Sequence, residues 1–139
     1  MWLFLSDISK VDEFLTNAKV FYLATVDGDQ PKCRPLGFHL LDDGKIYFGV
    51  GTFKNVYKQL EANPKLEIVA FDGERFLRYF GVAVLEDNED VVNKAFDLMP
   101  EIAEIYKSNG WQMGIFYVDD ATAEFRNMFE AEETFTFKY

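Results

Sequence analysis

The stretch Cys33-Arg-Pro-Leu-Gly-Phe-His39 opens the part of the sequence that decides the fold. It is followed by Lys45-Ile-Tyr-Phe-Gly-Val50, the turn Gly51-Thr-Phe-Lys54, and a segment that ends at Asn63-Pro64. The first two runs predict strands, and Asp42-Asp-Gly44 predicts a tight hairpin between them because Asp-Gly supplies the positive φ angles that such turns need. A short helix follows the turn and ends before the proline. Two strands, a turn and a helix start are therefore expected side by side.

Residues 32–58 also hold a concentration of positive charge in a chain whose formal net charge is −10. An acidic surface repels phosphate polymers and anionic lipid, so nucleic acid and membranes are poor partners. The basic segment indicates either a small anionic ligand or an ordinary solvated surface of strand and helix. Its basic residues are Lys32, Arg34, Lys45, Lys54 and Lys58, against Asp42 and Asp43.

Length and composition indicate one globular domain that covers residues 1–139. The chain is 49% hydrophobic, with 15 Phe and 7 Tyr, which is ample material for a core. Cys33 is the sole cysteine, so no intrachain disulfide forms and a cytoplasmic location is expected. The start of the chain, Met-Trp-Leu-Phe-Leu-Ser-Asp, is too short and lacks the basic region of a signal peptide.

The rest of the chain predicts further hairpins and short helices. A capping box at Ser9 begins the first helix, Pro100 separates two later helices, and Asp119-Asp120 forms a hairpin turn. The fold class is therefore mainly β (α+β), an antiparallel barrel of six or seven strands with helices at its rim. The expected helices are 9–18, 54–63, 88–99 and 100–110, and the expected strands are 20–26, 31–41, 46–50, 66–71, 76–85, 113–118 and 122–125. The tail 134–139 alternates apolar and polar residues, a pattern that would suit an additional edge strand.

Histidine and cysteine chemistry can be tested directly because the chain has one of each. Cys33 and His39 are six residues apart on one expected strand, about 20 Å at ~3.3 Å per residue, so they form no dyad. A tetrahedral metal site lacks its usual ligands. The remaining option is an all-carboxylate metal site built from the acids of 86–90 or 119–133. An acidic helix cap or a solvated turn also explains those residues. No metal site is predicted, and no catalytic residue is identified.

The turn at residues 49–55 matches neither the Rossmann nor the P-loop pattern. A strand that ends in small residues, then Thr52, then a helix starting near Lys54 would still direct N–H groups, a hydroxyl and an ammonium at one point, as anion sites do. Alternatively, Thr52 is an ordinary N-cap. Arg34 lies on a strand face with Leu36 and needs an acceptor there, either a phosphate or a buried carboxylate.

These residues resemble a known family, the pyridoxamine 5′-phosphate oxidase-like flavin-binding split β-barrels. The resemblance covers nearly the whole chain and implies a split-barrel homodimer with two flavin mononucleotide (FMN) sites at the subunit interface. The motifs that carry it are Phe21-Tyr-Leu-Ala-Thr-Val-Asp-Gly-Asp-Gln-Pro31, Arg34-Pro35, Ile46-Tyr-Phe48, Thr52-x-Lys54-Asn55, Gln59-Leu-x-x-Asn63-Pro64 and Arg78-Tyr-Phe-Gly81.

By similarity, each part of the FMN site has candidate residues in this sequence. Arg34 and Lys54 resemble the phosphate-binding cations, with Thr52 and Asn55 beside them. The ring and ribityl chain would lie along Pro35, Leu36 and Gly37, with Gly49 and Val50 continuing that wall. Trp111 and Gln112 are candidates to complete the site from the partner subunit; otherwise Trp111 is a core or interface aromatic.

Departures from the family pattern limit the expected activity. The C-terminal segment Glu-Thr-Phe-Thr-Phe-Lys-Tyr139 has neither the Arg nor the His of the oxidase substrate motif, so this is not a true pyridoxamine 5′-phosphate oxidase. Gly49 stands where nitroimidazole-resistance relatives often have a His, His39 is not an obvious replacement, and Phe76 stands where the oxidases have a flavin-contacting Gln.

The resemblance implies an FMN-dependent oxidoreductase acting on an unknown small molecule or electron donor, with the redox chemistry supplied by the flavin. The alternative is a non-catalytic binder or sensor of a flavin, a deazaflavin or haem. A third is a split barrel that acts through its dimer surface alone.

Overall fold

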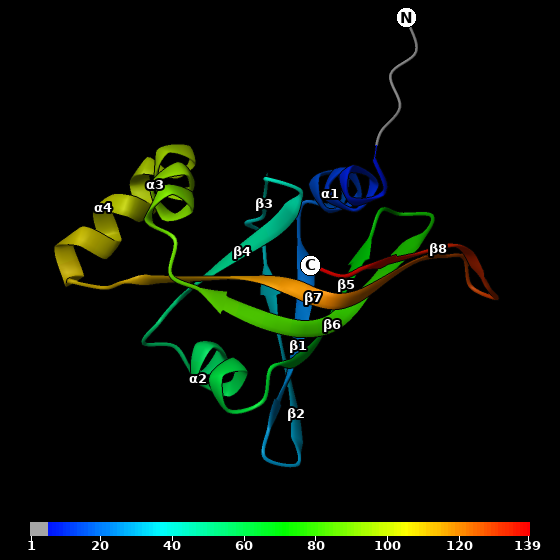
Figure 1. The fold of residues 1–139 in the computed structure, drawn as a ribbon, viewed down its shortest axis with the longest axis horizontal. Coiled ribbons are helices and arrows are strands. Elements are labelled where there is room, and N and C mark those ends of the chain that lie inside the picture. Colours follow the sequence, from blue (N-terminus) through cyan, green and yellow to red (C-terminus); the bar gives the residue numbers. More distant parts are fainter. Residues whose placement is uncertain (1–5) are drawn as a thin grey trace, which may run out of the picture.

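The computed structural model describes residues 6–139, and within them the chain forms one open, antiparallel sheet of eight strands with four helices (Figure 1). Strand order is β2-β1-β5-β6-β7-β4-β3, with β8 also paired to β7. This architecture confirms the expected α+β split barrel, with eight strands instead of six or seven. The elements are α1 (Asp7–Ala18), β1 (Phe21–Asp27), β2 (Gln30–Leu36), β3 (Leu40–Asp42), β4 (Lys45–Gly51), α2 (Asn55–Ala62), β5 (Lys65–Phe71), β6 (Phe76–Glu86), α3 (Glu89–Leu98), α4 (Pro100–Asn109), β7 (Met113–Arg126) and β8 (Ala131–Phe137).

Helix α1 begins earlier than the sequence indicated. Ser6 is its N-cap, and the Ser6 hydroxyl accepts a hydrogen bond from the Ser9 N–H at 3.3 Å. Ser9 therefore lies inside the first turn, and the predicted capping box at Ser9 is wrong because the cap is three residues earlier. The expectation that the chain does not start with a signal peptide rests partly on residues 1–5, which lie outside the described range.

The predicted strand 31–41 is interrupted in the structure. Strand β2 pairs with β1 as far as Leu36, whereas β3 pairs with β4 at the other edge of the sheet. The chain must cross between these edges through residues 37–39, which leave both ladders. His39 in this link is hydrogen-bonded to α1, so the crossing has a fixed contact with a helix.

Strand β7 replaces the hairpin predicted around Asp119-Asp120. It pairs with β6 on both sides of that dipeptide, from Arg126 opposite Phe76 to Ile115 opposite Glu86. Asp120 has φ 48°, and the register shifts between Phe80 and Val82, so the two aspartates lie at a β-bulge and not in a turn. A bulge bends a strand without ending it, which lets β7 run along the whole sheet.

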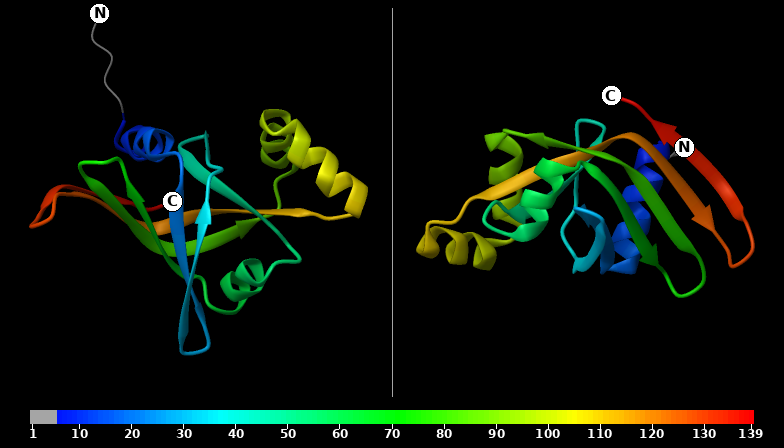
Figure 2. Two further views of the ribbon diagram at one scale, coloured as in Figure 1. Left: turned by 180° about the vertical axis from the view of Figure 1, so that it is seen from behind. Right: turned by 90° about the horizontal axis from the view of Figure 1, so that it is seen from below.

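The core lies between the inner face of this curved sheet and helices α1 and α2. Val11 and Leu15 of α1 and Leu60 of α2 are buried in one cluster with Phe21 and Phe48. Helices α3 and α4 project from one end of the molecule, away from α1 (Figure 2). In the described part of the chain, no helix is long and apolar enough to cross a membrane.

Candidate functional site

Strand β2 directs Arg34 toward the inside of the barrel. Arg34 is opposite Leu23 in the β1–β2 ladder, so the two residues share a face, and Thr25 two residues on points the same way. Leu23 and Thr25 are buried, whereas Cys33 and Pro35 on either side of Arg34 are exposed. The pairing register therefore places the Arg34 guanidinium on the inner side of the edge strand β2, at the margin of the core.

Three neutral acceptors hold the guanidinium. Its Nη1 donates to the Leu23 carbonyl oxygen at 3.1 Å and to Thr25 Oγ1 at 2.7 Å, and its Nη2 donates to Gln59 Oε1 at 2.8 Å. Thr25 Oγ1 in turn donates to Gln59 Oε1 at 2.6 Å. Among residues 6–139, no carboxylate forms an ion pair with Arg34, so the alternative of a buried carboxylate partner is wrong.

This arrangement leaves both charge and donors available on Arg34. Burial lowers the pKa of Arg34, while Cys33 acts weakly in the opposite direction, and a guanidinium with so high a normal pKa stays charged. Of its five N–H groups, the three bonds to described residues leave Nε–H and one Nη2–H. Such a positioned cation without a counter-charge is suited to bind an anion bidentately.

The turn after β4 leads directly into the first turn of α2. The Thr52 N–H donates to the Gln112 carbonyl oxygen and the Lys54 N–H donates to the Gly51 carbonyl oxygen, each at 3.0 Å. Lys54 is the N-cap of α2 and makes no side-chain capping bond, so the alternative of Thr52 as the N-cap is wrong. Within the described residues, the N–H groups of Asn55 and Val56 lack backbone acceptors, whereas those of Tyr57 and Lys58 donate to the Lys54 carbonyl oxygen, and this end of the helix carries the positive end of its dipole.

Gln59 connects these two parts of the site. It lies on α2 one turn after Asn55, on the same side of the helix, and its side-chain oxygen accepts from Arg34. A cavity of about 480 Å³ opens beside this face of α2. Its lining includes Asn55, Lys58, Gln59, Asn63 and the β1–β2 turn.

Sequence reasoning assigned no role to Thr25 or Gln59, which are the buried polar residues of the described core, 2% and 9% exposed. The signal was present in the sequence. Thr25 interrupts an inward-facing series that begins with Phe21 and Leu23, and Gln59 stands beside Leu60 on a buried helix face. A polar residue in such a position needs a buried partner, and here each one helps to hold Arg34.

The residues expected along the ring are spread over two strands. Pro35 is exposed on the side of β2 opposite Arg34, Leu36 packs against the core, and Gly37 lies in the link to β3. Gly37 lines an open cavity of about 500 Å³ with Phe38, His39, Leu98 and Met99.

On β4, the side chain of Val50 is buried in the core, 4% exposed, and Val50 is paired with Gly114 of β7. A Cβ at Gly49 would lie 2.8 Å from Met113 Sδ, so that side of the strand is closely packed.

Trp111 and Gln112 lie at the Thr52 turn of the same chain. The Gln112 carbonyl oxygen accepts the Thr52 N–H, and the Trp111 ring lies 4.4 Å from the Phe53 ring between centroids. Trp111 is 40% exposed, so it is not a core residue. A role for either residue in the partner's site stays a prediction.

His39 is held by α1. Its Nδ1 is 2.7 Å from Asp12 Oδ1, its Nε2 is 3.2 Å from Thr16 Oγ1, and its ring meets the Phe21 ring edge-on at 6.0 Å. Both ring nitrogens are thus engaged. Across residues 6–139, no three His, Cys, Asp or Glu side chains gather in a metal-binding group.

Comparison with known proteins agrees with this architecture. A solved NimC/NimA family protein from Clostridium acetobutylicum is 30% identical, with 92% of this chain and 90% of that chain covered and a TM-score of 0.82. General Stress Protein 26 from Bacillus anthracis shares the fold at 16% identity, with 92% and 96% covered and a TM-score of 0.67.

A heme binding protein from Mycobacterium smegmatis also shares the fold, at 16% identity, with 97% of this chain but 60% of that chain covered and a TM-score of 0.69. No curated protein matches the chain. The family model described as pyridoxamine 5′-phosphate oxidase matches residues 8–130. Because that match takes in most of the chain, this protein belongs to the pyridoxamine 5′-phosphate oxidase family.

Proposed function

We propose that this chain binds FMN and that Arg34 holds the cofactor phosphate. The observation that carries the proposal is the set of neutral acceptors around the guanidinium, which fixes its position and leaves its charge and two N–H groups free. A phosphate monoester offers the acceptor oxygens that match such a donor pair. Arg34 is half-buried, and holding a partly desolvated cation without a counter-ion costs free energy that a bound anion would offset.

The start of α2 supplies the second half of the phosphate site. Lys54 is exposed and has no ion pair within residues 6–139, and the first N–H groups of α2 carry the positive end of the helix dipole. Thr52 and Asn55 lie close to Lys54 in the sequence, at the same end of α2. Pro35, Leu36 and Gly37, with the β4 backbone at Gly49 and Val50, are proposed to border the ribityl chain and ring.

We further infer that the protein is an FMN-dependent oxidoreductase acting on a small molecule. FMN, when bound, supplies the redox chemistry, and the protein binds and orients it. Membership of the family and the likeness to the NimC/NimA family protein support this proposal. The chain is proposed to work as a cytoplasmic homodimer in which Trp111 and Gln112 of one subunit complete the site of the other.

A second candidate is a non-catalytic binder or sensor of a flavin or deazaflavin. It is favoured by His39, because the single histidine has both ring nitrogens engaged by α1 and so offers no free acid or base. The same contacts argue against haem held by His39, since ligation would require breaking the 2.7 Å contact to Asp12.

The cofactor proposal is tested by titrating apoprotein with FMN and with riboflavin, followed by flavin fluorescence. We expect stoichiometric FMN binding and at least about 10-fold weaker riboflavin binding, because one charge-assisted contact contributes about 1.5–3 kcal/mol. The double variant Arg34→Ala with Lys54→Ala should fold but no longer bind FMN. Lys54→Ala alone should weaken FMN binding. Lys107→Ala, on α4, is the matched control. Unchanged FMN affinity in the double variant would overturn the phosphate assignment.

Oxidoreductase and binder are separated by the fate of reduced flavin. FMN bound to the protein is reduced with dithionite, and its reoxidation is compared with that of free FMN across a panel of nitro, quinone and disulfide acceptors. Faster reoxidation by one acceptor class supports the oxidoreductase. Rates no greater than those of free FMN across the panel support the binder.

A further inference from the structure

A cavity of about 220 Å³ lies between α1 and the turn that joins β5 to β6. Figure 1 shows α1 next to this turn and to β8, on the side of the sheet away from α2. Pockets for drug-sized ligands and cofactors usually span ~300–1,000 Å³, so this smaller one suits a compact ligand with few atoms. It shares no lining residue with the cavity that adjoins the proposed phosphate site.

One wall of this cavity is a single face of α1. The wall consists of residues spaced three and four apart, which lie on one side of a helix, namely Lys10, Glu13, Phe14 and Asn17. Phe14 is buried, 5% exposed, whereas Glu13 and Asn17 are exposed at the rim. Helix α1 therefore supplies an ammonium, a carboxylate and an amide beside an aromatic floor.

The opposite wall is the β5–β6 turn, whose backbone fixes the position of Arg75. Asp72 Oδ1 accepts hydrogen bonds from the Glu74 N–H at 2.9 Å and from the Arg75 N–H at 2.7 Å. The Asp72 N–H donates to the Arg75 carbonyl oxygen at 3.1 Å. From this turn the Arg75 guanidinium lies over the rings of Phe14 and Phe125, 5.9 and 5.8 Å from their centroids. Contact with aromatic rings positions the cation without cancelling its charge.

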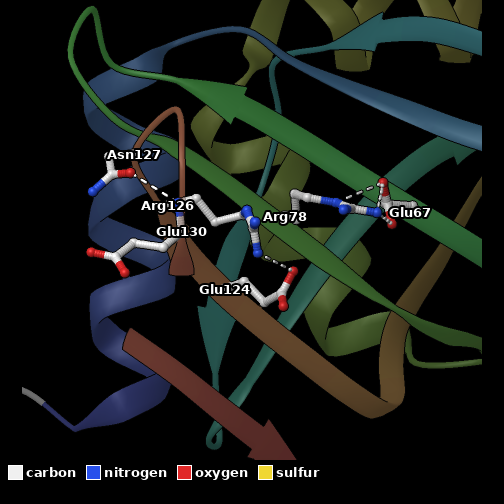
Figure 3. Close-up of polar contacts among 6 residues, drawn as sticks. All are labelled: Glu67, Arg78, Glu124, Arg126, Asn127 and Glu130. Carbon is white, nitrogen blue, oxygen red and sulfur yellow. Dashed lines mark hydrogen bonds and ion pairs between the residues drawn. The ribbon is translucent and has the colours of Figure 1, made fainter. Parts of the chain in front are cut away.

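Arg75 differs from the other three arginines of the chain, which all have polar partners. One is held by the acceptors of the proposed phosphate site. The other two pair with glutamates, Arg78 Nη2 with Glu67 Oε1 at 2.9 Å and Arg126 Nη1 with Glu124 Oε1 at 3.4 Å (Figure 3). Within residues 6–139, the half-buried Arg75 side chain has neither a hydrogen bond nor an ion pair. Its N–H donors are therefore available to a ligand in the cavity.

Glu13 is the carboxylate that matches Arg75 across the cavity. Among the described residues it forms no ion pair and accepts no hydrogen bond. The other charged groups of the lining are engaged. Lys10 Nζ lies 3.7 Å from Glu133 Oε2 and 5.0 Å from the Phe135 ring centroid, and Asp72 holds the turn. The cavity thus presents one guanidinium and one carboxylate that are not paired with each other.

The charge pattern of the lining selects the class of ligand. Two cations stand against three carboxylates, in a chain of formal net charge −10, so a simple anion is repelled. A simple cation is attracted to Glu13 but leaves the Arg75 guanidinium facing a like charge. A zwitterion satisfies both groups, because its carboxylate accepts from Arg75 and its ammonium donates to Glu13.

We propose that this cavity binds a small α-amino acid, with its carboxylate on Arg75 and its ammonium on Glu13. The Asn17 amide makes no hydrogen bond within residues 6–139, lies one turn after Glu13 on α1, and adds an acceptor and donors at the rim. The volume limits the ligand to an amino acid with a short side chain. This inference does not rest on the proposed FMN site, because the two cavities have no residue in common.

The test is a titration of the full chain with L-alanine, propionate and ethylamine, followed by the NMR signals of the backbone amides. Propionate lacks the ammonium of alanine, and ethylamine lacks its carboxylate. We expect L-alanine to bind with a Kd of about 1 mM or below and to move the amide signals of Glu74 and Arg75. Each analogue should bind at least about 10-fold more weakly because it loses one charge-assisted contact. Equal affinity for the three compounds, or no binding of L-alanine, glycine or L-serine at about 10 mM, would overturn the proposal.

Two variants assign the two ends of the ligand. Arg75→Gln should bind L-alanine at least about 10-fold more weakly and no better than ethylamine, and Glu13→Gln should bind it no better than propionate. Arg126→Gln and Glu132→Gln remove the same charges outside the cavity and should leave all three affinities unchanged. Far-UV circular dichroism verifies that the variants are folded, and FMN binding by Arg75→Gln should equal that of wild type. Unchanged binding of L-alanine in Arg75→Gln and Glu13→Gln would overturn the site.

Discussion

Arg34 Nη2 donates a hydrogen bond to Gln59 Oε1 across 2.8 Å, and this contact ties an edge strand to the helix that begins at the proposed phosphate site. The acceptor is an amide and not a carboxylate, so it positions the guanidinium without cancelling its charge. A cation placed in this way loses little further freedom when an anion binds.

Gln59→Glu tests this distinction between positioning and neutralising. The glutamate keeps an acceptor oxygen in the same place but forms an ion pair with Arg34, which competes with the phosphate. We expect FMN affinity to fall about 10- to 100-fold, the equivalent of one charge-assisted hydrogen bond, while the urea midpoint stays within a small margin of wild type. Glu61→Gln, an exposed change of charge on the same helix, is the control. Undiminished FMN affinity in Gln59→Glu would contradict a phosphate at Arg34.

Thr25→Val tests the buried part of the same network. Thr25 is 2% exposed, accepts from Arg34 Nη1 at 2.7 Å and donates to Gln59 Oε1 at 2.6 Å. Valine fills the same space but leaves a guanidinium N–H without its partner, so we expect a loss of about 1–3 kcal/mol in the free energy of unfolding. Urea denaturation measures it. Thr122→Val, half-buried on β7, should change stability far less, and equal effects at the two positions would refute the argument.

Gly81→Ala tests the bulge that replaced a predicted hairpin. A Cβ at Gly81 would lie 2.5 Å from the Asp119 carbonyl oxygen and 3.0 Å from Ala121 Cα, both of them backbone atoms that cannot rotate away. We expect the variant to lose about 2 kcal/mol or more of stability because overpacking against backbone forces the strands apart. Gly73→Ala is the contrasting change, since its cost comes from a positive φ of 99° and no atom lies within 4 Å. A Gly81→Ala protein as stable as wild type would argue against the bulge geometry.

The sequence was sufficient to predict the fold class, and it singled out Arg34 as the candidate cation of the proposed site. Asp-Gly turns and alternating strands predict a barrel, and Arg34 could be singled out because a charge among apolar neighbours needs a partner. Thr25 and Gln59 were not identified as that partner. They are 34 residues apart along the chain. The packing of α2 on β1 brings them together, and the pairing of β1 with β2 brings Arg34 to them.

The predictions at Asp119-Asp120 and at Ser9 were wrong for one reason: in both places the local sequence fits two structures, and the rest of the fold decides between them. Aspartate tolerates a positive φ in a turn and in a bulge alike, and only the partner strand decides between them. Here the ten paired residues of β6, with Gly81 opposite the bulge, keep β7 continuous. At α1 both Ser6 and Ser9 satisfy the capping preference, and the choice of Ser6 depends on where the chain enters the helix.

Asp119 provides a prediction on pH. Hydrogen bonds from the N–H groups of Tyr139 and Asp120 to the carboxylate hold the pKa of Asp119 below its usual 3.8. A carboxyl group with a lowered pKa in the folded state stabilises the protein above its unfolded-state pKa, and the contribution disappears as the pH falls through the folded-state value. Wild type should therefore be more stable than Asp119→Asn at pH 7, and the difference should shrink as the pH falls below the usual carboxyl pKa of 3.8 and through the lowered folded-state value. Asp120→Asn, which removes the same charge at the next position, is the matched control because an asparagine accepts the φ of 48° there. Urea midpoints measured from pH 2.5 to 7 give the comparison, and a difference between wild type and Asp119→Asn that does not change with pH would show that the Tyr139 contact carries no linkage.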